Sequence, residues 1–223
     1  MRNRLRRTDL HVLLVVYVLV SAVGCHTLYY DTMEKLGYHK RDLLVSDVEK
    51  ARDAQQEAKE QFKSAFERFS SVLNVQGGEL QDQYNTLNSE YERCARKAKA
   101  VRTRIASVED VSDALFKEWK AELGQYSNAK FRRTSEQKLN QTRKQYGQLI
   151  KAMKRAEVKM NPVMAAFKDQ VLFLKHNLNA QAIASLKSEL ASVEQNISSL
   201  IKEMEESIKE ADSFLTAMAT DKG

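Results

Sequence analysis

Residues 80–119 read LQDQYNTLNSEYERCARKAKAVRTRIASVEDVSDALFKEW, and this stretch decides the fold. Its apolar side chains recur at alternating intervals of four and three residues, and only Ser112 interrupts the series. The positions are Leu80, Tyr84, Leu87, Tyr91, Cys94, Ala98, Val101, Ile105, Val108, Leu115 and Trp119. Such a repeat, kept over about five heptads, is typical of a long helix that packs along its length against other helices.

The same spacing occurs in three further segments of the chain. Glycine or asparagine residues separate the segments, and these residue types end one helix or cap the next. Four such helices can bury their apolar stripes only against one another. We therefore expect an all-α fold, an elongated antiparallel four-helix bundle of coiled-coil character with up-down-up-down topology. Pro162 is expected to kink or divide the third helix. The expected helices are residues 32–74, 79–124, 129–176 and 180–218, within a single domain of residues 25–223.

Residues 1–24 have the layout of a secretory signal peptide, with four arginines, an apolar run and small residues before Cys25. The segment is similar to the leaders of bacterial lipoproteins, in which cleavage before the cysteine is followed by acylation of its thiol. That similarity implies lipid attachment at Cys25 and a body that faces the periplasm. His26 stands where such proteins carry an aspartate for retention at the inner membrane, so the outer membrane is favoured over the inner one.

Two other interpretations of the leader stay open. An uncleaved anchor over residues 10–30 would contain 21 mostly apolar residues, close to the ~20 that a spanning helix needs. The pair Arg6-Arg7 also fits export by the twin-arginine route. In all three cases the arginines stay in the cytoplasm, and the body lies in the cell envelope beyond the inner membrane.

The formal net charge of the whole chain is +6, but the leader accounts for half of it. Residues 25–223 carry 32 basic and 29 acidic side chains. This near balance lacks the basic footprint of a nucleic-acid-binding protein, so no nucleic-acid partner is expected.

Ten basic residues gather in residues 130–159. Acidic segments on the neighbouring helices are expected to pair with most of them, including Lys154 with Glu203. The exceptions are Lys130, Arg132 and Arg133, which lie beside a turn at the tethered end of the bundle. These three residues are the candidate lipid-surface contact.

The run at residues 171–174 is apolar on all sides, which is more than the buried stripe of one helix requires. Large exposed apolar patches usually mark contact sites, so this end of the bundle is the candidate site for a partner. The alternative, that these side chains close the end of the core, stays open. The candidate partner-contact residues are Phe167, Leu172, Phe173, His176 and Leu178.

The sequence lacks the motifs of common catalytic and cofactor sites, such as HExxH, GxSxG, a phosphate-binding loop and CxxC. Outside the leader region, His39 and His176 are expected at opposite ends of the bundle, where they cannot share a metal ion. Cys94 lies on the apolar stripe and is expected to be a buried thiol. We therefore expect no catalytic residue, no cofactor and no metal.

Three blocks of the sequence are not generic heptads: residues 38–45 (YHKRDLLV), 48–56 (VEKARDAQQ) and 169–180 (DQVLFLKHNLNA). They resemble the signature blocks of an uncharacterised bacterial domain-of-unknown-function family of long-helical envelope proteins. The resemblance covers roughly residues 30–215. It implies a bacterial source and a helical fold, and it carries over no activity, ligand or functional residue.

These observations favour a non-enzymatic, membrane-anchored envelope lipoprotein that acts as a structural or protein-interaction rod. Its expected partners are the membrane, through the lipid anchor, and an envelope protein or the cell wall. Extra apolar positions such as Phe131 and Leu172 leave a homo-oligomer open. The alternative is a membrane-acting protein of the pore-forming or remodelling kind, although no segment after the leader reaches ~18 uninterrupted apolar residues.

Overall fold

The structure is a computed structural model that describes residues 39–74, 80–177 and 180–220. Four long helices follow one another: α2 (Lys40–Asn74), α3 (Leu80–Glu122), α4 (Ala129–His176) and α5 (Ala180–Thr220). A short 3-10 helix, η1 (Leu123–Gln125), continues directly from α3. The expected all-α fold is confirmed. The expected signal peptide and the lipid-attachment residue Cys25 lie outside the described residues.

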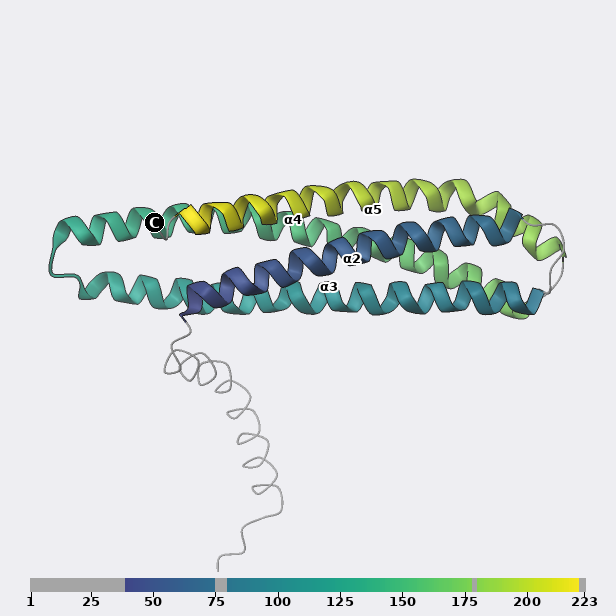
Figure 1. The fold of residues 1–223 in the computed structure, drawn as a ribbon, viewed down its shortest axis with the longest axis horizontal. Coiled ribbons are helices and arrows are strands. Elements are labelled where there is room, and N and C mark those ends of the chain that lie inside the picture. Colours follow the sequence, from purple (N-terminus) through teal and green to yellow (C-terminus); the bar gives the residue numbers. More distant parts are fainter. Residues whose placement is uncertain (1–38, 75–79, 178–179, 221–223) are drawn as a thin grey trace, which may run out of the picture.

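The four helices form an antiparallel bundle in which each helix packs against two others (Figure 1). α2 packs on α3 and α5, and α4 packs on α3 and α5, so the chain closes into a ring of four helices. Successive helices run in opposite directions, which confirms the up-down-up-down topology. The apolar stripes meet inside this ring, where Phe69 of α2 and Phe167 of α4 stack with ring centroids 4.4 Å apart.

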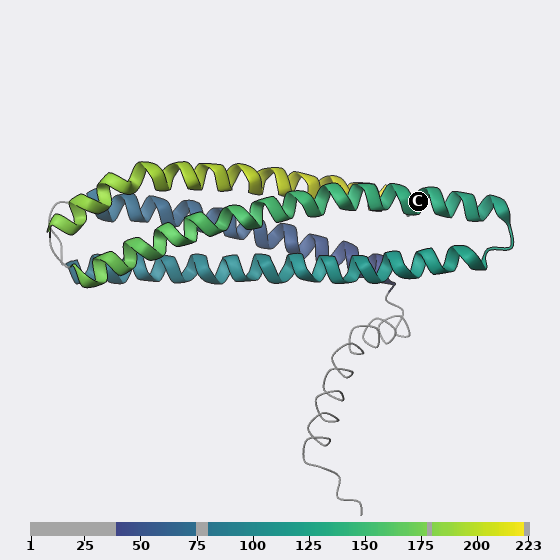
Figure 2. The same cartoon turned by 180° about the vertical axis from the view of Figure 1, so that it is seen from behind.

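The helices differ in length, and this difference shapes one end of the molecule. α2 has 35 residues, whereas α4 has 48. At the end where α2 begins, α3 and α4 continue beyond both α2 and α5 as a pair of helices (Figures 1 and 2). We call residues 119–138 the arm and this end of the bundle the arm end. The far end is the opposite end, where α2 leads to α3 and α4 leads to α5.

Two contacts mark the level at which α2 begins and α5 ends. Lys40 Nζ lies 2.7 Å from Glu118 Oε1, and the Arg41 guanidinium donates to the Met218 carbonyl at 3.0 Å. α2 begins at Lys40 and not near residue 32. His39 lies just outside the helix, and its carbonyl accepts the first helical hydrogen bonds, from the amides of Asp42 and Leu43. Residues 32–38 lie outside the described part of the chain.

α4 continues through Pro162 as one helix, so of the two expected effects of this residue, a kink or a division, the division is wrong. A proline has no amide hydrogen, and the carbonyl four residues earlier, that of Val158, loses its helical partner. Val158, Asn161 and Pro162 are all exposed, so water can solvate that carbonyl. The Asn161 side chain also accepts a hydrogen bond from Arg102 of α3 at 2.8 Å.

Candidate functional site

The turn at the end of the arm is fixed by local hydrogen bonds. Asn128 caps α4, because its side-chain oxygen accepts from the amides of Lys130 at 2.8 Å and Phe131 at 3.3 Å. On the other side of the turn, η1 ends at Gln125, and Tyr126 is extended. The three residues between η1 and α4 therefore form a tight turn, which holds Tyr126 and Phe131 at the tip of the arm.

The tip combines exposed aromatic rings with exposed cations. Tyr126 is 43% exposed and Phe131 is 61% exposed. Lys130, Arg132 and Arg133 are exposed as well, and within the described part of the chain none of these three side chains forms an ion pair. Residues 123–135 contain no acidic residue, so this segment has a net charge of +3.

Among the described residues, contacts of α4 with α3 and with η1 hold the arm together. Trp119 Nε1 donates to Ser135 Oγ at 2.8 Å, and Leu123 is buried. At the base of the arm, the Phe116 ring meets Tyr146 edge to face at 5.4 Å, and Arg143 lies 5.3 Å above the Phe116 ring. Burial raises the pKa of Tyr146. These contacts give the arm a defined shape although only two helices form it.

Further along α4, cations of the basic segment pair with acidic residues on both neighbouring helices, as expected. Lys154 pairs with Glu109 of α3 at 2.7 Å, and this hydrogen bond raises the pKa of Lys154. Arg155 pairs with Glu203 and Glu206 of α5, at 2.9 and 3.4 Å. The expected pairing of Lys154 with Glu203 is therefore wrong by one residue, because the neighbouring Arg155 faces α5 in its place.

At the far end, the structure separates the candidate partner-contact residues into two groups. Leu172 and Phe173 are 43% and 40% exposed, and His176 is also exposed, so these three lie together on the surface of the last turns of α4. Phe167 is fully buried in the stack with Phe69, and its expected role as a surface contact is wrong. Leu178 lies outside the described residues.

The run at residues 171–174 is therefore partly core and partly surface, so each of the two interpretations left open by the sequence fits some of its residues. Val171 and Leu174 are buried and close the core, whereas Leu172 and Phe173 face solvent. A helix turns by about 100° per residue, so four consecutive apolar residues cannot all face one core.

Three polar features of the core were not found from the sequence. Glu90 is buried and accepts hydrogen bonds from Gln61 at 2.9 Å and Arg93 at 3.0 Å. Gln55 of α2 accepts from Ser207 of α5 at 2.8 Å inside the bundle. Gln170 is buried, and both polar atoms of its amide lack a partner among the described residues. Glu90 and Gln170 each stand one residue before an apolar position, Tyr91 and Val171, so periodicity alone does not show which polar residues the core accepts.

Cys94 is a buried thiol, as its place on the apolar stripe predicted. It is fully buried, and its Sγ lies 3.9 Å from the Gln61 carbonyl oxygen. Burial, with a smaller effect of the nearby Glu90 carboxylate, raises the pKa of Cys94 to about 12. The thiolate is therefore strongly disfavoured in the folded protein.

The described residues hold no group of three or more His, Cys, Asp or Glu side chains that could bind a metal ion. Among the helices that the structure describes, none combines the length and apolar character that a membrane span requires.

The fold defines the class of this molecule: it is a long helical-bundle protein with a two-helix arm. A family model described as a protein of unknown function, DUF2959, matches residues 29–218. The chain therefore belongs to this family, which confirms the expected membership of a domain family of unknown function. No curated protein and no solved structure matches the chain.

Proposed function

We propose that this protein is a non-enzymatic, lipid-anchored rod of the bacterial cell envelope. It faces the periplasm, with the outer membrane favoured, and presents its far end to an envelope protein or to the cell wall. The observation that carries the proposal is the place where the chain enters the bundle. Lys40 begins α2 at the arm end, and Leu172 and Phe173 belong to the last turns of α4, which ends at the far end (Figure 1).

The length of the bundle determines how far the far end lies from the tethered end. α4 has 48 residues, and at ~1.5 Å per residue it is ~70 Å long. A chain tethered through Cys25 and entering at the arm end would carry its far end well away from the membrane surface. The neighbouring exposed side chains of Leu172 and Phe173 would then be within reach of a protein or of the cell wall across the periplasm. Contiguous exposed apolar patches, unlike single exposed apolar residues, usually mark contact sites.

The anchor is tested by mass spectrometry of the mature N-terminus together with a Cys25→Ser variant. We expect an acylated Cys25 in the parent protein and a variant that is either released from the membrane or left as an uncleaved precursor. An unmodified N-terminus, or a variant that fractionates and migrates as the parent does, would contradict the lipoprotein proposal.

The contact at the far end is tested with a photo-crosslinking residue in intact cells. Position 173 is compared with position 158, because Val158 is an exposed apolar residue on the same helix, at the middle of the bundle. We expect one defined adduct, to a protein or to the cell wall, at position 173 and none at position 158. Equal adducts at both positions would show that the far end has no special role.

A further inference from the structure

We propose that the tip of the arm is a second membrane contact, which binds an anionic phospholipid surface through Lys130, Arg132 and Arg133 and places the rings of Tyr126 and Phe131 at the level of the headgroups. This proposal rests on the proposed envelope function and adds to it. A tether alone would let the rod take any angle to the membrane, whereas a second contact would hold it upright.

The first argument is position. The arm extends beyond the first residue of α2, Lys40, at the end of the bundle where α2 begins (Figures 1 and 2). Glu118 lies beside Lys40, and the seven residues from there to Gln125 add only ~10 Å of helix. Thirteen residues separate Cys25 from His39, and such a segment reaches at most ~45 Å. A tether of this length allows the tip to touch the membrane that holds Cys25.

The second argument is the chemistry of the tip. Three cations that form no ion pair with a described residue lie within four residues of one another. Residues 123–135 contain no carboxylate that would repel an anionic surface. Basic clusters of this kind are attracted to anionic lipids. Aromatic side chains are enriched at the membrane interface, where Tyr places its hydroxyl in the wet layer and its ring in the apolar one.

The third argument is that the helices leave Phe131 uncovered. Ser135 faces α3, because it accepts the hydrogen bond from Trp119. Phe131 lies one turn earlier on α4, on the same face. The 3-10 helix ends at Gln125, and no further turn of α3 covers this ring, which stays 61% exposed. A large aromatic ring that the fold holds in solvent is a feature that a lipid surface would cover.

The experiment places an environment-sensitive fluorophore on single introduced cysteines in the full chain, in a Cys94→Ala background. Ala129→Cys reports on the tip. Ala165→Cys is its matched control, because both alanines are exposed residues of α4 and the 36 residues between them make about ten whole turns, which puts both on one helix face. The acylated protein is reconstituted into vesicles of phosphatidylcholine with or without phosphatidylglycerol.

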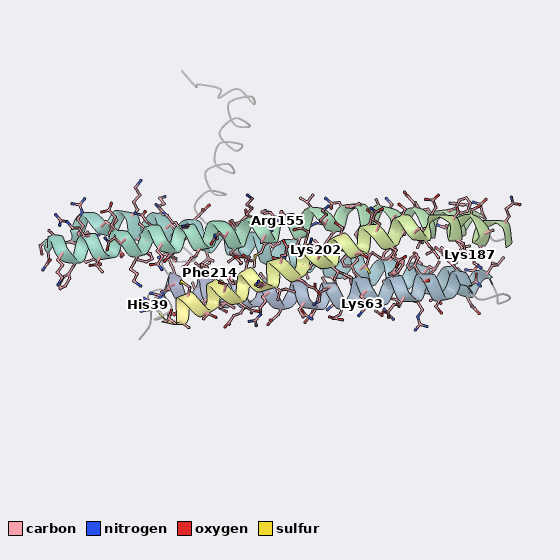
Figure 3. The ribbon with its side chains drawn as sticks, turned by 90° about the horizontal axis from the view of Figure 1, so that it is seen from above. His39, Lys63, Arg155, Lys187, Lys202 and Phe214 are labelled. Carbon is pink, nitrogen blue, oxygen red and sulfur yellow. The ribbon has the colours of Figure 1, made fainter. Side chains whose placement is uncertain are left out.

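We expect a severalfold rise and a blue shift of the fluorescence at position 129 in vesicles that contain phosphatidylglycerol, and no change at position 165. Replacing both Tyr126 and Phe131 by Ser should abolish the shift. Lys130→Gln, Arg132→Gln and Arg133→Gln together should abolish the dependence on phosphatidylglycerol. The control is Lys63→Gln, Lys187→Gln and Lys202→Gln, which removes the same charge from α2 and α5 away from the arm (Figure 3); it should leave the signal unchanged.

The outcomes separate this proposal from the lipid anchor. Acylated protein that stays on the vesicles while position 129 behaves as position 165 does would overturn the tip contact and leave the anchor standing. An unacylated N-terminus with the shift still present at position 129 would refute the anchor and retain the contact. The same shift without vesicles, at rising protein concentration, would show that a second copy of the chain covers the tip, and it would overturn the proposal.

Discussion

Phe131 and Phe167 lie 36 residues apart on α4, which is about ten whole turns of a helix. They therefore occupy the same helix face, yet Phe167 is fully buried and Phe131 is 61% exposed. In the body of the bundle α2 reaches across the core to stack Phe69 on Phe167, whereas in the arm neither α2 nor α5 accompanies α4. Burial here depends on how many helices are present at a given level, and the face of the helix alone does not determine it.

The strongest test of this comparison replaces each of the two rings by alanine. Phe167→Ala should lower the free energy of unfolding by ~3–5 kcal/mol, because it leaves a cavity beside Phe69. Phe131→Ala should change it by less than about 0.5 kcal/mol, because the ring is exposed and packs against little. Urea unfolding followed by circular dichroism measures both values. Equal losses would mean that the arm is covered in solution.

At the far end, one turn of α4 carries both buried and exposed apolar side chains, which allows a second comparison. Leu174→Ala should cost ~2–5 kcal/mol, because Leu174 is fully buried. Leu172→Ala and Phe173→Ala should each cost less than about 1 kcal/mol, since both side chains face solvent, and yet they should remove a cross-linked partner. Thermal melts and cross-linking in cells read out the two effects. If all three variants are destabilised alike and no adduct is lost selectively, this end only closes the core.

The ionisation and reactivity of the Cys94 thiol test whether the body of the bundle is closed. The folded protein holds the pKa of the Cys94 thiol at about 12, above the value of 9.0 for a free thiol. The native state therefore keeps its proton while the unfolded chain loses it, so this stability is complete below pH 9 and is lost as the pH rises toward 12. The free energy of unfolding should fall by up to ~1.4 kcal/mol per pH unit in that range.

Two measurements check the expected behaviour of Cys94. Unfolding titrations at rising pH should show a shallower pH dependence in a Cys94→Ala variant than in the parent. A thiol reagent should label Cys94 only on unfolding, because the buried thiol seldom ionises. Rapid labelling of the native protein would mean that the body opens at this level, and the contrast between a closed body and an exposed arm would fail.

Much of this fold follows from the sequence, because the apolar repeat and the capping residues are local signals. α4 begins at Ala129 and ends at His176 as expected, and Asn128 caps it. The arm could not be foreseen in the same way. The repeat continues through Leu115, Trp119 and Leu139, so the stripe looks the same where four helices meet and where two do.

The ion pairs show a second limit of reasoning from sequence. Folding the chain back at its turns predicts which segments meet, and acidic residues of α3 and α5 do lie beside the basic segment of α4. The partner of each charge also depends on the rotation of the helix about its axis. One residue changes that direction by about 100°, and so Arg155 reaches Glu203 while Lys154 turns to Glu109.

The smallest expected effects compare one hydroxyl in the body with one in the arm. Ser207 donates to Gln55 inside the bundle, and the Gln55 amide nitrogen has no partner among the described residues. Ser207→Ala should therefore cost ~1–3 kcal/mol by leaving a buried acceptor unsatisfied. Ser135 accepts from Trp119 where water is close, so Ser135→Ala should cost only ~0.5–1 kcal/mol.

The two serine variants should also differ in which part of the molecule is destabilised. Trp119 is the only tryptophan of the chain, so its fluorescence reports on the arm alone. Ser135→Ala should shift its emission to the red and speed amide exchange in residues 119–138, because the arm opens locally while α2 and α5 keep the body closed. Ser207→Ala should lower the global unfolding midpoint and leave the emission unchanged. If Ser135→Ala instead lowers the global midpoint with no local change, the arm and the body unfold as one unit, and the distinction between them holds for exposure but not for stability.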